Sequence, residues 1–136
     1  MKYLSLKLFL VLSISTTYLP AFAEIVLIVN PKNAVSSMTA EQASQYYLGI
    51  SNSFVPIDQA DGSPIRVEFY KKITNKEPGQ VRAIWAKLVF TGKGRMPKEM
   101  ASHEEVKKAV AADPNAIGYI DKSALDGSVK AVLNVP

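Results

Sequence analysis

The stretch "DGSPIRVEFY", Asp61 to Tyr70, decides how the chain is interpreted because it has the layout of a helix start. Ser63 is a preferred residue type for an N-cap, and Pro64 suits the first helical position, where its missing N–H costs nothing. One buried helix face is predicted by apolar residues that recur every four positions, namely Ile65, Phe69 and Ile73.

This helix start raises a question of chemistry. A helix N-terminus carries unpaired N–H groups and a partial positive charge, so an oxyanion can bind there. Ser63 would donate its hydroxyl, and Arg66 would close on a phosphate or carboxylate as a bidentate fork. The alternative is that Ser63 only caps its own helix, for about 1 kcal/mol, and that Arg66 lies on the surface. The local pattern alone favours this alternative, because every helix has an N-terminus.

Strand and helix signals alternate on both sides of this stretch. Short apolar or β-branched runs predict strands at residues 24–30, 54–58, 117–120 and 129–133. Capping residues and apolar periodicity predict helices that begin at Thr39, Ser63, Pro78 and Ser102, with a short helical turn near Ser123. The order β-α-β-α-α-α-β-β predicts an α/β layer sandwich, in which helices flank a small mixed sheet.

Residues 1–23 are predicted to be a signal peptide. Lys2 and Lys7 stand before an apolar run at residues 8–14, and Ala21-Phe22-Ala23 is a small-residue exit. The apolar run is shorter than the ~20 residues that cross a bilayer. We therefore expect cleavage after Ala23, a periplasmic location and one domain over residues 24–136. The sequence has no cysteine, so neither disulfides nor a lipoprotein anchor is expected.

Composition argues against several classes of function. The net charge is +4, and two of the basic residues belong to the predicted signal peptide, so a dense basic face for nucleic acid is not expected. His103 is the only histidine, so no metal site, cofactor or catalytic group is predicted, and His103 is expected to be a solvated first-turn residue. The segment "TGKGR", residues 91–95, lacks a Walker pattern and indicates a basic connector or a rim for an acidic partner.

Four segments, taken in chain order, carry a family resemblance. They are "IVLIVNPKNAVSSMTAEQASQYYLG" at residues 25–49, "VPIDQADGSPIRVEFYKKI" at 55–73, "WAKLVFTGKGRMPKE" at 85–99 and "AIGYID" at 116–121. They resemble the phosphate-binding proteins of bacterial ABC transporters, and more closely the single-lobe, PstS-like exported proteins known as phosphate ABC transporter substrate-binding proteins. The resemblance implies a single lobe of a type 2 periplasmic binding protein and no enzymatic activity.

The resemblance also implies an oxyanion site. In full-length relatives one phosphate cradle is a D-G-S-G-T loop at a helix start, with an arginine four residues before its serine. Residues 61–63 match this loop, whereas Pro64 and Ile65 replace the second glycine and the threonine, and Gln59 stands at the arginine position. The implied partners are phosphate or a similar oxyanion, an ABC transporter permease or another envelope protein, and a second copy in a homodimer. The implied ligand-binding residues are Gln59, Gly62, Ser63 and Arg66.

The departures from the family loop support a second hypothesis. Proline removes a backbone N–H donor and isoleucine removes a hydroxyl, although a dehydrated phosphate needs many donors. One lobe also has no second wall to close over an anion. The alternative function is therefore a ligand-free interaction module of the cell envelope, derived from the same lobe and favoured by Gln59, Pro64 and Ile65.

Overall fold

The computed structural model describes residues 13–15 and 24–136. The predicted signal peptide, residues 1–23, therefore lies outside the described residues except for positions 13–15. Its cleavage and the domain bounds 24–136 stay predictions.

A five-stranded mixed sheet forms the centre of the fold, with the order β3-β2-β4-β1-β5. Its strands are β1 (Ile25–Val29), β2 (Val55–Gln59), β3 (Lys98–Met100), β4 (Ala116–Asp121) and β5 (Lys130–Asn134). Strand β1 is antiparallel to β4 and β5, whereas β2 is parallel to β3 and β4. The predicted mixed sheet is confirmed. Edge strand β3 was not predicted, because its three residues, Lys-Glu-Met, carry no apolar pattern.

The helices begin close to the predicted positions. They are α1 (Ala40–Tyr47), α2 (Pro64–Thr74), α3 (Pro78–Phe90) and α4 (His103–Ala112), and a 3₁₀ turn, η1 (Lys122–Ala124), follows β4. Thr39 and Gln42 form the predicted reciprocal capping box at α1. Ser63 is the N-cap residue of α2, as predicted, but its side chain makes no capping bond. Within residues 13–15 and 24–136, no helix has the length and apolarity needed to cross a membrane.

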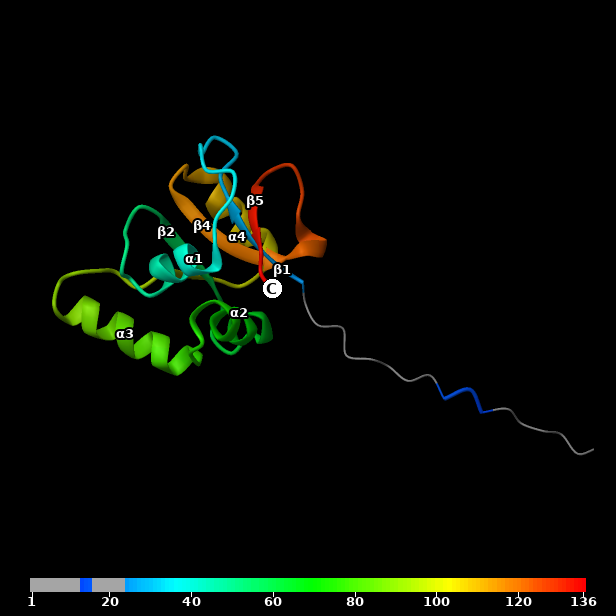
Figure 1. The fold of residues 1–136 in the computed structure, drawn as a ribbon, viewed down its shortest axis with the longest axis horizontal. Helices are drawn as coiled ribbons and strands as arrows, with labels where there is room; N and C mark the ends of the chain where they lie inside the picture. Colours follow the sequence, from blue (N-terminus) through cyan, green and yellow to red (C-terminus); the bar gives the residue numbers. More distant parts are fainter. Residues whose placement is uncertain (1–12, 16–23) are drawn as a thin grey trace, which may run out of the picture.

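Helices α1 and α2 lie on one face of the sheet, α3 packs against these two helices, and α4 covers the other face (Figure 1). Alternate residues of β1 divide between the two sides. Ile25, Leu27 and Val29 join the cluster under α1–α3, and Val26 and Ile28 join the cluster under α4. The continuous apolar run that predicts this strand therefore reflects burial on both faces.

Strands β2 and β4 pair through their backbones only at their first residues, Val55–Pro56 with Ala116–Ile117. Side chains join the rest of the two strands. The hydroxyl of Tyr47 lies 2.9 Å from the carbonyl oxygen of Ile57 and 3.2 Å from that of Ile117. The side-chain amide of Gln59 donates to the carbonyl of Tyr119 at 2.9 Å. The carboxyl ends of the strands are thus held apart by polar side chains.

A buried carboxylate, Asp58, occupies this gap with 2% of its surface exposed. The hydroxyls of Tyr70 and Tyr119 donate to its two oxygens, and Arg66 Nε makes an ionic contact with Oδ2 at 3.7 Å. Burial raises the pKa of Asp58 above its usual value, while the two tyrosine bonds and the Arg66 guanidinium oppose the rise. The carboxylate therefore depends on its partners for stability inside the fold.

Arg66 is buried, with 3% of its surface exposed, so the surface position that the alternative interpretation gave it is wrong. Its Nη1 donates to the carbonyl of Gln59 at 3.2 Å and to Glu99 Oε1 at 2.7 Å. Together with Asp58, these contacts tie α2 to β2 and β3. A charged residue between apolar helix positions is expected to face solvent. Arg66 is buried instead because its acceptors, Asp58, Glu99 and the Gln59 carbonyl, belong to the strands beneath the helix.

Replacing Tyr47 with phenylalanine should lower the free energy of unfolding by about 1–2 kcal/mol, because two buried carbonyls lose their shared donor. Urea unfolding measures the change. The neighbouring Tyr46→Phe variant is the control, since no bond of the Tyr46 hydroxyl is found in the described part of the chain. A similar loss in both variants would show that the bridge between β2 and β4 contributes nothing.

The Arg66→Gln variant should lose stability on the order of 3 kcal/mol near pH 8, because it leaves the buried Asp58 carboxylate without its cation. The folded-state pKa of Asp58 is already raised and should rise further without Arg66. A raised carboxyl pKa gives stability that is present below the unfolded pKa and is lost as pH rises through the folded pKa. The loss should therefore be smaller at about pH 5, as urea unfolding at the two pH values will show.

The Arg82→Gln variant is the matched control. Arg82 pairs with Asp61 at 2.6 Å, but the two side chains are 47% and 59% exposed, so we expect a loss below about 1 kcal/mol with little dependence on pH. Equal losses for the two arginine variants would contradict the structural role assigned to Arg66.

Candidate functional site

A pocket of about 420 Å³ lies at the carboxyl ends of the parallel strands. Gln59 is the last residue of β2, Asp121 is the last residue of β4, and residues 101–103 follow β3. In open α/β sheets this edge is where ligands bind. The lining residues are Gln59, Ser63, Pro64, Ile65, Ala101, Ser102, His103 and Asp121.

The N-termini of α2 and α4 meet at this pocket. In their first turns the backbone N–H groups of Ile65, His103 and Glu104 have no bond to any described residue. Helix α2 offers only one such amide, since Pro64 has no N–H and the N–H of Arg66 already bonds to the Ser63 carbonyl. Free amides and the positive ends of two helices favour an anionic ligand.

The side chain of Ser63 adds an available hydroxyl. Its oxygen is buried and has no hydrogen-bond partner in the structure, although Ser63 lines the pocket. A buried polar atom without a partner is costly unless a ligand or water bonds to it. Ser63 is therefore a donor that a ligand in the pocket can use.

Gln59 and His103 lie side by side in the pocket wall. The Gln59 Nε2 atom donates to the Tyr119 carbonyl at 2.9 Å and lies 3.3 Å from His103 Nδ1. Both of its hydrogens are thus directed at protein acceptors, and its side chain retains only an acceptor oxygen. His103, which was expected to be a solvated residue, is half-buried here.

Asp121 places a carboxylate on the same wall. Its Oδ1 accepts from the N–H of Ser123 at 2.9 Å and from the Ser123 hydroxyl at 2.8 Å. These bonds lower the pKa of Asp121 below its usual value, and the nearby His103 adds to the effect. The pocket therefore combines positive helix ends with one negative side chain.

The structure brings two of the four predicted ligand residues to the pocket, Gln59 and Ser63. Gly62 stands beside Ser63 and turns the chain after β2 with a φ of 80°, which favours glycine. Arg66 points away from the pocket lining, onto Asp58 and Glu99. Sequence reasoning did not assign Ser102, His103 or Asp121 to this site; the capping serine at residue 102 and the strand end "YID" were the available signals.

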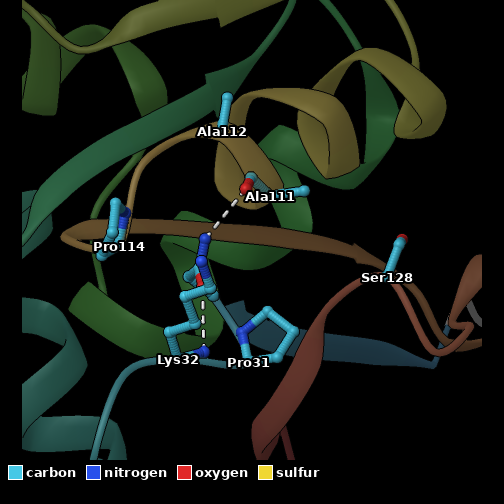
Figure 2. A pocket seen from close by; sticks show the side chains of 7 residues that line it. Pro31, Lys32, Ala111, Ala112, Pro114 and Ser128 are labelled. Carbon is cyan, nitrogen blue, oxygen red and sulfur yellow. Dashed lines mark hydrogen bonds between the residues drawn. The ribbon is translucent and has the colours of Figure 1, made fainter.

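Two other hollows differ in character from this pocket. One of about 280 Å³ lies at the carboxyl end of α4, beside Ala111, Ala112 and Pro114 (Figure 2). The Asn30 amide donates there to the carbonyls of Val110 and Ala111, and its oxygen accepts from the Lys32 N–H. That helix end carries partial negative charge. Another of about 440 Å³ lies at the start of β2. Its walls are largely apolar and include Val55 and Met96, and Arg95, Lys98 and Asp113 are the charged residues of its lining.

Over the described residues, no group of three or more His, Asp or Glu side chains is placed to hold a metal ion. The candidate site is thus built from backbone amides, a hydroxyl and a histidine.

Solved structures share this fold. The first is described as a phosphate ABC transporter substrate-binding protein with bound phosphate from Clostridium perfringens; it matches 81% of this chain and 44% of its own, with a TM-score of 0.65 and 25% identity. An ABC-type phosphate transport receptor from Vibrio cholerae matches with a TM-score of 0.63 and 19% identity, over 81% of this chain and 45% of its own. PstS from Borrelia burgdorferi matches with a TM-score of 0.62 and 15% identity, over 81% and 46%.

The chain thus spans less than half the length of these solved structures, with shares of 44%, 45% and 46%. No family model matches the sequence. The resemblance predicted from the sequence is confirmed at the level of the fold. The chain is similar to PstS-type phosphate ABC transporter substrate-binding proteins and has the architecture of a single lobe of a periplasmic binding protein.

Proposed function

We propose that the protein is an exported, non-enzymatic solute-binding protein that holds phosphate or a similar oxyanion between the N-termini of α2 and α4. The observation that carries the proposal is the pocket itself, where unpaired backbone amides and the unpaired Ser63 hydroxyl come together. The similarity to a protein with bound phosphate supports the choice of ligand. The role would be in ABC-type phosphate uptake, in the periplasm.

Each proposed site residue has a distinct task. Ser63 donates its hydroxyl to the anion, together with the amides of Ile65, His103 and Glu104. Gly62 sets the turn that places Ser63 at the helix start. Gln59 and Arg66 support the site without donating to the anion. The Arg66 guanidinium bonds to the Gln59 carbonyl and holds the end of β2 beneath the pocket.

The pocket is open on one side, because Pro64, Ala101 and Ser102 are exposed. Water that reaches a bound anion weakens every electrostatic contact with it. We therefore expect modest affinity for phosphate, and stronger binding when a second surface covers the pocket. A transporter permease, another envelope protein or a second copy of the chain would supply that surface.

The second candidate, a ligand-free interaction module, is favoured by two observations. Asp121 puts a negative charge on the pocket wall, which disfavours an anion. Both N–H groups of the Gln59 amide already bond to protein acceptors, so they are not available to a ligand. An envelope partner that is retained in phosphate-free buffer, together with an absence of phosphate binding, would select this candidate over the first.

Isothermal titration with millimolar phosphate tests the first proposal, with sulfate for comparison. Ser63→Ala should weaken phosphate binding by about tenfold, since it removes one hydrogen bond to a charged ligand. It should leave the free energy of unfolding nearly unchanged, because the Ser63 side chain makes no capping bond.

Thr39→Ala is the matched control. Thr39 caps α1, outside the pocket lining, through the bond that the N–H of Gln42 donates to its hydroxyl at 3.1 Å. The variant should lose about 1 kcal/mol of stability and keep its phosphate affinity. The proposal is wrong if the unmodified protein shows no saturable heat with phosphate.

A further inference from the structure

The contact between Gln59 and His103 fixes which nitrogen of the imidazole carries a proton. The backbone carbonyl of Tyr119 can only accept, so the side-chain atom of Gln59 that faces it at 2.9 Å must be the amide nitrogen. The same nitrogen lies 3.3 Å from His103 Nδ1 and has a second hydrogen to donate. His103 Nδ1 is therefore the acceptor, and the neutral ring carries its proton on Nε2.

The Nε2–H edge of His103 lies on the opposite side of the ring from Gln59. No hydrogen bond of this nitrogen is found in the part of the chain that the structure describes, and His103 lines the pocket. Arg66, the cation in the first turn of α2, is bound to Asp58 and Glu99 instead. Among the lining residues, His103 is the one side chain that can carry a positive charge.

Several charged groups surround the ring. Asp121, at the end of β4, lines the same pocket and lies near the ring. The residues that α2 and β2 contribute to the lining are uncharged. On its own helix, Glu104 pairs with Lys107 at 2.9 Å, and the Glu105 carboxylate accepts from the Ala101 N–H at 2.9 Å.

Two charged residues of neighbouring elements are already paired. Glu99, on β3, is held by Arg66, and Lys122, which follows Asp121, lies 3.6 Å from Glu24. Asp121 is therefore the negatively charged neighbour of His103 within the pocket lining. An anion in the pocket adds a second negative neighbour and favours the protonated ring.

We propose that His103 contacts the bound oxyanion through Nε2 and that its protonation makes binding stronger as pH falls. The inference rests on the proposed function and names a residue that the sequence did not assign to the site. Linkage requires the reverse effect as well: the anion must raise the pH at which the imidazole takes up its proton. Binding and protonation are then two measurements of one coupling.

The sequence contains a single histidine, so an untagged sample gives one imidazole to follow by NMR without assignment. The Cε1–H signal is titrated with pH in the presence and absence of saturating inorganic phosphate. We expect the midpoint to move up by about one pH unit, which corresponds to about tenfold coupling. An unmoved midpoint, while calorimetry shows phosphate binding, overturns this inference alone; absence of phosphate binding overturns the proposed function with it.

A variant supplies a second readout. The ratio of the phosphate affinity at about pH 5.5 to that at about pH 7.5 should be about fivefold larger in the unmodified protein than in His103→Gln, because this window spans only part of the tenfold coupling. The titration of phosphate itself is common to both proteins and cancels in this comparison. Lys108→Gln, which removes an exposed charge from the same helix, should keep the unmodified ratio. Equal ratios in His103→Gln and the unmodified protein overturn the proposal, and the NMR titration needs no variant.

Discussion

The buried carboxylate of Asp58 is the constraint on which the rest of the structure depends. It lies where β2 and β4 stop pairing through their backbones, and Tyr70, Tyr119 and Arg66 surround it. A charge at this depth is stable only with partners, so it draws Arg66 inward from α2. The contact between Arg66 and Asp58 thereby holds the helix start at Ser63 over the end of β2, and this position determines the geometry of the pocket.

The same constraint determines what the pocket can offer an anion. Because the charge of Arg66 is used inside the fold, the proposed attraction for an anion rests on two helix N-termini, on the Ser63 hydroxyl and on His103. Asp121 works against them. Such a balance suits a ligand that is captured reversibly, with affinity that depends on pH and on whatever surface covers the open side.

Much of the fold could be predicted from the sequence because its signals are local. The capping box at Thr39, the proline at position 64 and the apolar run of β1 each determine structure within a few residues. The three-residue strand β3 could not be predicted, since its pairing with β2 depends on residues far away in the chain. Strand order and direction are likewise properties of the assembled sheet.

The candidate site likewise combines residues that local sequence signals indicate with residues that only the folded chain brings together. Gln59 and Ser63 were predicted because a family resemblance and a helix start lie in one segment. His103 and Asp121 come from α4 and β4, and only the sheet topology brings them to Ser63. The burial of Arg66 was missed for a related reason: its acceptors, Asp58 and Glu99, belong to other strands.

The central claim is that the anion binds between the two helix starts while Arg66 stays on Asp58. Amide NMR spectra recorded during a phosphate titration test it most directly. The account predicts that the largest shift changes fall on the N–H groups of Ile65, His103 and Glu104, with the Arg66 Nε–H signal unmoved. Changes centred on Lys32 or Arg95 instead, or a large change at Arg66 Nε with none at the two helix starts, would contradict it.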